Sequence, residues 1–198
     1  MSAYLQIRIP VWLDKIIAWP ILLYRRLRYN RPFRRIPLGQ NLFALVDPDD
    51  YYWLNQFHWS PRRNSNCVYA VRFLNLKGRK NKIISMHREI CKPSKGRLVD
   101  HRNNNTLDNC RHNLRTATHS QNQYNKKKTP KKTSSRYIGV YLEKSSRLWA
   151  TKISRRGKSF WLGRFKSETD AALAYDNAAR KYHGQFARLN FTEGIFLS

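Results

Sequence analysis

The sequence predicts an α+β protein made of two small domains. We expect a β-rich part that leads into a β-β-α module, then a three-stranded antiparallel sheet packed on one helix. The length of 198 residues allows two modest cores. Residues 126–134 contain five lysines, one proline and no aliphatic or aromatic side chain, which is typical of a basic, solvated linker. On each side of this linker, short strand-like runs precede a helix signal.

The charge of the chain restricts the class of partner. There are 39 Lys and Arg against 12 Asp and Glu, which gives a formal net charge of +27. A polyanion would relieve the mutual repulsion of these groups, so nucleic acid is the expected partner, and an anionic membrane or ribosomal RNA is the alternative. Cys67, Cys91 and Cys110 form no CxxC pair, so we expect reduced thiols and neither a disulfide framework nor a cysteine zinc site.

Residues 1–35 are expected to form a basic arm. The apolar run from Ile16 to Tyr24 is too short to span a bilayer, and Asp14 and Lys15 interrupt the longer stretch. The arginines that follow the run are Arg25, Arg26, Arg28, Arg31, Arg34 and Arg35. These features predict an amphipathic basic helix or a disordered arm, without stable membrane insertion. Organelle targeting is the lesser alternative, because hydroxyl residues are scarce.

Residues 36–86 are expected to be β-rich. Residues 36–38 and 43–47 have the composition of short strands, and 48–50 supply a turn before a short helix. Residues 68–73 and 83–86 predict a hairpin with 77–79 in its turn. The aromatic-rich segment between these strands favours a core role over base stacking, because several of its members recur at helical spacing: Tyr51, Tyr52, Trp53, Leu54, Phe57 and Trp59.

Residues 98–122 follow a β-β-α order. A strand that begins at Leu98 stops at Asp100 and His101, and the Asn-rich run after it must be a loop because it has nothing to bury. A second short strand is expected over 114–117, and a helix from Ser120 onward.

Three side chains of this stretch have the chemistry needed to hydrolyse a phosphodiester. A hard cation that neutralises the developing charge requires oxygen ligands, which Asp100 and Asn122 supply. His101 carries an imidazole, whose ordinary pKa lies near neutrality, and is the candidate general base. Adjacent strand residues point to opposite faces, so Asp100 and His101 can share a site only if the backbone turns where the strand ends.

Residues 86–125 resemble the HNH endonuclease family, in the branch of phage and intron-borne homing enzymes whose metal site uses Asp and Asn. The resemblance implies that Asp100 and Asn122 bind one divalent cation, Mg²⁺ with Mn²⁺ as the alternative. It further implies that His101 is the general base and that Asn113 belongs to the catalytic set by bracing its loop. The structural cysteine pairs of the zinc-stabilised branch are missing, so no zinc is expected. The alternative for the same residues is a polar turn without catalysis.

Residues 135–191 predict three strands and a helix. The strands cover 137–141, 148–153 and 160–165, with hairpin turns at 145–146 and 155–158. Ser167 has the character of an N-cap, and Gly184 that of a helix stop. Between them the apolar residues recur at helical spacing, and the alanines among them let the helix lie close to a sheet: Ala171, Ala174, Tyr175, Ala178, Ala179 and Tyr182.

This region resembles the ethylene-response-factor (ERF, apetala-type) DNA-binding domain, through residues 137–140, 161–163, 174–176 and 189–191. In that family the sheet enters the major groove and the helix backs it, so the partner implied is double-stranded DNA. The usual arginines of the first strand are replaced here by Ile138, Tyr141 and Glu143, and Ser154 and Ser159 occupy two later positions, so the sequence preference does not carry over. The DNA-binding residues expected here are Tyr141, Lys144, Arg147, Lys152, Arg155, Arg156, Lys158, Trp161 and Arg164.

Together the two resemblances predict a monomeric, metal-dependent homing or mobile-element endonuclease that cuts DNA phosphodiesters after docking through its C-terminal domain. The alternative is a non-catalytic DNA-binding transcription regulator of ERF type with a vestigial HNH module. The domains expected are 1–35, 36–125, the linker 126–134, 135–191 and a tail 192–198. The expected location is the cytoplasm of a bacterium or phage host, or the nucleus or an organelle in a eukaryote.

Overall fold

The computed structural model describes residues 10–64, 67–75, 82–126 and 134–191. The chain divides into two compact units, one of residues 1–92 with 105–115 and the other of residues 93–104 with 116–198. Most of the expected linker 126–134, the expected turn at 77–79 and the tail 192–198 lie outside the described residues. The division into units therefore falls upstream of the boundary that the linker suggested.

The first unit begins with a long helix, α1, which covers Val11–Tyr29 of the expected basic arm. It is followed by β1 (Arg34–Gly39) and β2 (Leu42–Val46), which pair antiparallel, and by α2 (Pro48–Leu54). The inward side chains of the hairpin, Ile36, Leu38, Ala44 and Val46, are all buried. None of the helices among the described residues is both long enough and apolar enough to cross a bilayer.

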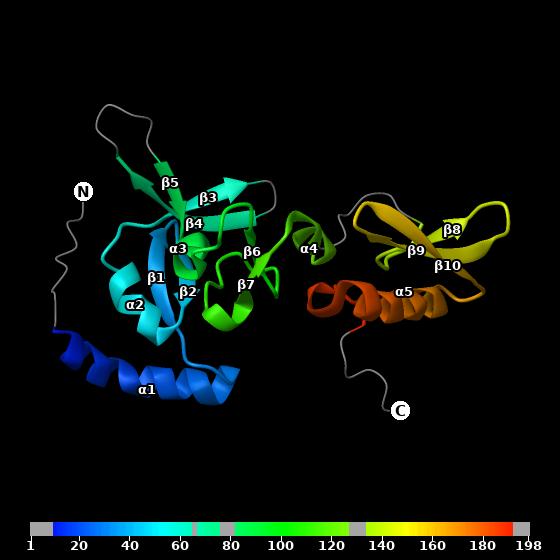
Figure 1. Cartoon of the computed structure of the whole chain (residues 1–198). Coiled ribbons are helices and arrows are strands. Elements are labelled where there is room, and N and C mark those ends of the chain that lie inside the picture. The colour runs from blue at the N-terminus through cyan, green and yellow to red at the C-terminus, as the bar shows by residue number, and fades with distance from the viewer. Residues whose placement is uncertain (1–9, 65–66, 76–81, 127–133, 192–198) are drawn as a thin grey trace. The chain divides into compact units, whose positions relative to one another are not determined.

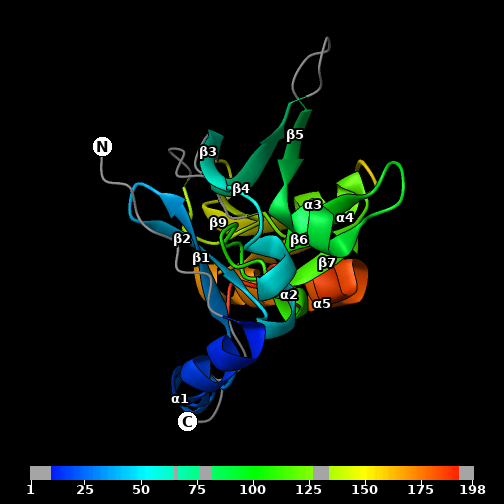
Figure 2. The same cartoon turned by 90° about the vertical axis from the view of Figure 1, so that its left-hand side faces the viewer.

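A second sheet of the first unit has the order β3–β4–β5. The expected hairpin is present as β4 (Cys67–Leu74) and β5 (Lys82–Ser85), and α3 (Met86–Cys91) follows where the second strand was expected to continue. The edge strand β3 (Ser60–Asn64) was not predicted, because its sequence is polar and contains a proline, which only an edge position tolerates. In both views α1 lies on the opposite side of β1 and β2 from β5 (Figures 1 and 2).

The aromatic-rich segment is only partly a core. Trp59 and Leu54 are fully buried, and the indole Nε1 of Trp59 donates to the Leu54 carbonyl over 2.8 Å. Phe57, in contrast, is exposed. The core interpretation is therefore confirmed for Trp59 and Leu54 and wrong for Phe57, whose ring lies at the surface with the Arg72 guanidinium 4.1 Å from its centroid.

The β-β-α order expected after residue 98 is present. It comprises β6 (Leu98–His101), a 3₁₀ turn η1 (Arg111–Asn113), β7 (Leu114–Ala117) and α4 (His119–Tyr124). The helix begins one residue earlier than expected because Thr118 caps it. The Thr118 hydroxyl accepts from the Gln121 amide, and the Gln121 side chain accepts from the Thr118 amide.

The C-terminal region of the second unit has the predicted architecture. The strands β8 (Val140–Glu143), β9 (Leu148–Arg155) and β10 (Lys158–Phe165) form an antiparallel sheet of order β10–β9–β8, and α5 (Glu168–His183) packs on one face of it before the short η2 (Gly184–Phe186) (Figure 1). The Ser167 hydroxyl caps α5 by accepting from the Thr169 and Asp170 amides. Ala171, Ala172 and Ala179 are completely buried, which allows the close approach of helix and sheet.

Two buried contacts hold this region together. Gly139 has a φ of +76°, and a Cβ built there would overlap the Tyr175 ring, so the close approach of α5 requires glycine. The Asp176 carboxylate, 1% exposed, accepts from the backbone amides of Asn190 and Phe191. The segment after η2 is thereby fastened to α5.

Candidate nucleic-acid interface

Strand alternation gives the sheet two different faces. The register places one set of side chains on the side away from α5, and we call Tyr141, Glu143, Lys152, Trp161 and Arg164 the outer face. The opposite side carries Val140 and Ile153, which pack in the core with α5. Trp161 is 51% exposed, whereas Trp149 belongs to the core cluster, so the two tryptophans of the sheet have different roles.

Each cation of the outer face lies over an aromatic ring. The Lys152 Nζ is 5.6 Å from the centroid of the Tyr141 ring, and the Arg164 Cζ is 5.2 Å from that of Trp161. Such contacts are favourable even at exposed sites, and they restrict long side chains that would otherwise be mobile. The outer face therefore presents two oriented cations with apolar surface beside them.

Glu143 holds Arg164 from a second direction. The Arg164 Nε donates to one Glu143 oxygen over 2.5 Å and its Nη2 to the other over 2.9 Å, and Ser146 donates to the same carboxylate. The hydrogen bonds from Arg164 and then Ser146 lower the pKa of Glu143 from 4.5 to about 2, so this carboxylate is ionised at neutral pH. The pair uses the Nε donor and one donor of Nη2, so the donors of Nη1 and the second donor of Nη2 are not used by this pair.

This network was missed in the sequence. Glu143 was noted only as a position where an arginine was lost, and Arg164 only as a phosphate contact. The two lie on β8 and β10, with β9 between them, so their proximity depends on strand order and register. The signal that could have revealed it is the presence of one acid, Glu143, and one base, Arg164, on the same face of the predicted sheet.

The other predicted DNA contacts divide into two groups. Lys144, Arg147, Arg156 and Lys158 are exposed in or beside the two hairpin turns, where phosphates could reach them. Arg155 lies on the opposite side of the sheet, with its guanidinium 5.6 Å from the Tyr182 ring of α5. Its prediction rested on membership of a basic turn, and that membership alone does not determine the face.

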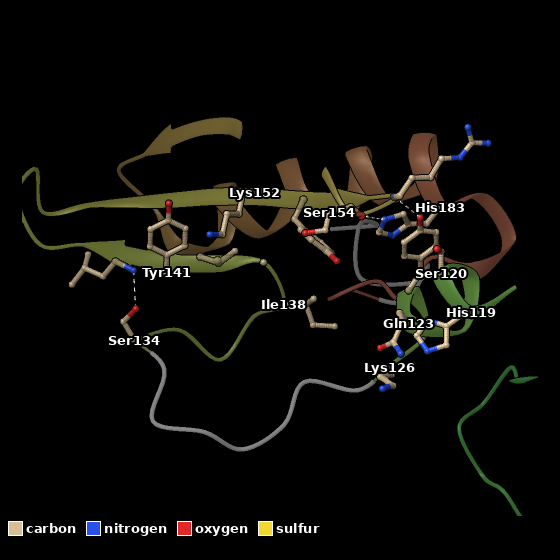
Figure 3. A pocket seen from close by; sticks show the side chains of 17 residues that line it. His119, Ser120, Gln123, Lys126, Ser134, Ile138, Tyr141, Lys152, Ser154 and His183 are labelled. Carbon is tan, nitrogen blue, oxygen red and sulfur yellow. Dashed lines mark hydrogen bonds between the residues drawn. The ribbon is translucent and has the colours of Figure 1, made fainter. Parts of the chain in front are cut away.

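A cavity of about 920 Å³ runs along β8, the edge strand of the sheet, to α4 (Figure 3). Tyr141 and Lys152 line one end, and His119, Ser120 and Gln123 line the other, with Ser154 between them next to His183 (Figure 3). The Tyr124 ring of α4 stacks on His183 at a centroid distance of 3.8 Å, and the His183 Nε2 contacts the Ser154 carbonyl. Among the residues that line this cavity none is acidic, whereas Lys126, Lys152 and Arg156 are cationic, so the cavity favours an anion.

The residues predicted as a hydrolytic site have a structural role. Asp100 and His101 are 6% and 5% exposed at the end of β6. The amide Nδ2 that donates to both Asp100 oxygens, over 3.0 and 3.1 Å, belongs to Asn125, which also donates to the His101 carbonyl over 2.9 Å. Asn122, three residues earlier, lies half-buried on α4. This arrangement fastens the turn after β6, and a divalent cation at Asp100 and Asn122 stays a prediction.

Asn113 belongs to the other unit, where its Nδ2 donates to the Asp108 carbonyl over 2.8 Å. Its contact in that unit therefore braces the loop at Asp108, and its proposed action on His101 stays a prediction.

One group of side chains within the described residues has the composition of a metal site, at a place the sequence did not suggest. Asp47, Cys110 and His112 bring their ligand atoms within 4.8 Å of one another. The Arg31 guanidinium, however, contacts the His112 Nε2 over 2.7 Å and forms an ion pair with Asp108. Burial also raises the pKa of the Cys110 thiol, which disfavours the thiolate that a metal requires. We therefore interpret this group as a structural cluster, with His112 held by Arg31 and Asp47 by the Arg111 amide.

Comparison with known proteins identifies the C-terminal region. Residues 135–185 match the AP2 domain. The dehydration-responsive element-binding protein 2E of Arabidopsis thaliana is 52% identical over 42 residues, which are 21% of this chain and 17% of that protein. Protein 2D of the same name and organism is 41% identical over 68 residues, 33% of this chain and 32% of that protein. The AP2/ERF and B3 domain-containing transcription repressor TEM1, also from Arabidopsis thaliana, is 39% identical over 62 residues, 31% and 17% of the two chains.

These comparisons confirm part of the prediction and correct another part. Residues 135–185 are an AP2/ERF DNA-binding domain, as the resemblance implied. The prediction of an enzyme is wrong, because the matching domain and relatives are those of AP2/ERF transcription factors and not of HNH endonucleases. The physical reason lies in the residues that suggested it, since Asp100 and His101 are buried and Asn125 engages both oxygens of the acid. The chain spans at most about a third of the relatives named here.

Proposed function

We propose that this chain is a DNA-binding transcription regulator that docks on double-stranded DNA through the outer face of its AP2 domain. The observation that carries the proposal is the pairing of Lys152 with Tyr141 and of Arg164 with Trp161 on a face that α5 leaves open. In the ERF family that this domain resembles, the sheet enters the major groove, and the exposed turn cations, such as Arg147 and Lys158, are placed to contact phosphates. If the source is eukaryotic, this function requires a nuclear location or an organelle that contains DNA.

The first test separates the two sides of the domain. Lys152 lies on the outer face, and Lys181 is exposed on α5 behind the sheet. A bound sequence is first selected from a random pool of duplex DNA, and affinity for it is then measured by fluorescence anisotropy. Lys152→Gln should weaken binding about three- to tenfold and reduce the salt slope by about one. Lys181→Gln removes the same charge and should change the affinity less than about twofold. Equal losses in the two variants would refute docking through the outer face.

Arg164 is the residue we propose as the reader of a base. With its Nε and Nη2 edge engaged by Glu143, the remaining edge of Nη1 and Nη2 can donate two parallel hydrogen bonds. Guanine presents the matching pair of acceptors, O6 and N7, in the major groove. The ring of Trp161 and the carboxylate of Glu143 fix this edge before DNA arrives, so less side-chain entropy is lost on binding.

The second test examines this base contact. Selection with the unchanged chain should give one position at which guanine is strongly preferred. In Arg164→Gln this preference should fall about tenfold or more, because a good bidentate contact contributes about 1–3 kcal/mol of discrimination. In Glu143→Gln the guanine preference should persist at lower affinity, because the arginine edge remains but is no longer held. A selected sequence that is identical for the unchanged chain and Arg164→Gln would overturn the assignment.

A further inference from the structure

Helix α1 is fastened to the first unit by one side only. The Asp14 carboxylate accepts from the Arg34 guanidinium, over 2.9 and 3.2 Å, and from the Tyr52 hydroxyl over 2.9 Å. One turn further, Ala18 is buried, and Arg25 donates to the Phe33 carbonyl. These contacts identify the inner side of α1 and fix how the helix is rotated about its axis.

The opposite side of α1 is a stripe of large apolar side chains in the described structure. Its members are spaced by four, three, four and four residues, which keeps them within an arc of about 100° on a helix with 3.6 residues per turn. Their exposed fractions range from 40% to 79%. We call this set the apolar stripe: Trp12, Ile16, Trp19, Leu23 and Leu27. A contiguous exposed surface of this kind marks an interaction site, and DNA binding by the AP2 domain does not use it.

Cations border the apolar stripe along one edge. Helical projection places Lys15 and Arg26 there, and both are exposed. The other edge continues into Tyr24 and Ile17, which are exposed apolar side chains as well. The only acidic residue of α1 is Asp14, whose charge is directed inward. The outward side of α1 therefore combines a broad apolar surface with one positive margin.

From this arrangement we propose that α1 binds peripherally to anionic phospholipid surfaces, lying in the plane of the interface. The aliphatic members of the apolar stripe would enter the boundary between head groups and acyl chains, and Trp12 and Trp19 would lie at head-group depth, where amphipathic rings are favoured. Lys15 and Arg26 have long apolar stems that let their charges reach the phosphates. The inner side of α1 stays on the protein, so the helix need not leave its contacts with Arg34 and Tyr52.

Charge distinguishes this partner from other occupants. A second copy of the chain packed through the same stripe would bring Lys15 and Arg26 close to the same cations, with no exposed acid on α1 to pair with them. Nucleic acid would satisfy the cations but would leave the five apolar side chains of the stripe without an apolar partner. An anionic lipid surface satisfies both components at once.

The test uses the full chain and vesicles of phosphatidylcholine, either alone or with about a third of phosphatidylserine. Binding is measured by co-sedimentation and by the blue shift of tryptophan fluorescence. The unchanged chain should bind the anionic vesicles at least about tenfold more tightly than the neutral ones. Trp12→Ser/Trp19→Ser should lower the affinity for anionic vesicles about tenfold or more.

A matched control shows whether vesicle binding depends on the apolar stripe itself, on the net charge of the chain, or on any exposed apolar side chain. Phe43 and Phe73 are exposed aromatic residues of β2 and β4 in the same unit, so Phe43→Ser/Phe73→Ser removes comparable surface elsewhere. This variant should bind vesicles like the unchanged chain. Equal vesicle binding by all three proteins would mean that charge alone attracts the chain, and it would overturn the proposal. So would a concentration-dependent dimer that Trp12→Ser/Trp19→Ser abolishes in the absence of vesicle binding.

Discussion

Helix α1 and the outer face of the AP2 sheet use the same residue types in different arrangements. Both consist of exposed aromatic residues and cations, with one acid that pairs with an arginine. On α1 the apolar side chains form a continuous stripe, and Lys15 and Arg26 lie along one margin of it. On the sheet each cation lies over its own ring, so charge and apolar surface alternate. Composition alone therefore does not identify the partner, because the first arrangement suits a lipid interface and the second a grooved polyanion.

The largest effect is expected from Gly139→Ala, which should abolish the function of the AP2 sheet and leave that of α1 intact. The new Cβ would overlap the Tyr175 ring and lie 2.9 Å from the Lys152 carbonyl, at a φ of +76°. A ring packed in the core cannot move aside cheaply, so we expect a loss of about 3 kcal/mol or more in the stability of the AP2 domain. DNA affinity should fall more than about a hundredfold, whereas vesicle binding by α1 should persist.

Gly157→Ala provides the control for Gly139→Ala. Gly157 has nearly the same φ, +78°, but nothing lies within 4 Å of its Cβ position. Only the backbone cost of about 1–2 kcal/mol should therefore appear. Thermal unfolding followed by circular dichroism measures both variants. If the two alanines destabilised the domain equally, the contact with Tyr175 would have no special role in holding α5 against the sheet.

Raising the salt concentration should weaken DNA binding by the sheet much more than vesicle binding by α1. Contacts between exposed cations and phosphates release counterions, so DNA affinity should fall about a hundredfold or more between 50 and 200 mM salt. Vesicle binding should fall much less, by about tenfold, because burial of the apolar stripe is not screened. Titrations of the unchanged chain at four salt concentrations give both slopes. Parallel slopes would indicate that α1, like the sheet, binds through charge alone.

Replacing the tryptophans of one surface at a time tests directly whether the two surfaces bind different partners. Trp161→Ala should lower DNA affinity about tenfold, because it removes apolar contact and also the ring under Arg164. It should leave vesicle binding unchanged. Trp12→Ser/Trp19→Ser should show the reverse pattern. Its unchanged DNA affinity would show that the AP2 domain folds, and a circular dichroism spectrum like that of the unchanged chain would show that the first unit folds. A loss of both activities in either variant would contradict the assignment of separate surfaces.

Local sequence signals predicted most of the fold. Alternation and turn residues located β1, β2, β4, β5 and the three strands of the AP2 domain, and Ser167 with Gly184 marked the ends of α5. The misses have physical causes. Strand β3 has a polar sequence that only pairing with β4 makes extended. Phe57 and Trp59 both lie beyond α2, so helical spacing could not distinguish the exposed ring from the buried one.

The candidate site was less predictable, because it depends on which side chains meet. Residue types at a suitable spacing suggested that Asp100, His101 and Asn122 form a hydrolytic site, but the amide that reaches the Asp100 oxygens comes from Asn125. The same limit applies to the sheet. Arg155 was predicted from its basic neighbours, but its side chain lies on the α5 side. Glu143 and Arg164 meet only through strand order, which no local pattern contains.

The smallest effect expected is a shift in titration, and it tests whether the outer face is fixed before DNA binds. Hydrogen bonds from Arg164 and Ser146 lower the pKa of Glu143 to about 2, so the stabilisation from this pair is present above the ordinary value of 4.5 and is lost as the pH falls toward 2. DNA affinity should therefore show no step from Glu143 between pH 5 and 8. The side-chain carboxyl ¹³C shift of Glu143 should give a midpoint near 2 in the unchanged chain and in Lys181→Gln, and should move up toward 4.5 in Arg164→Gln. A midpoint near 4.5 in the unchanged chain would mean that Arg164 is mobile in solution, and that base recognition by this residue has to bear the full entropic cost of ordering it.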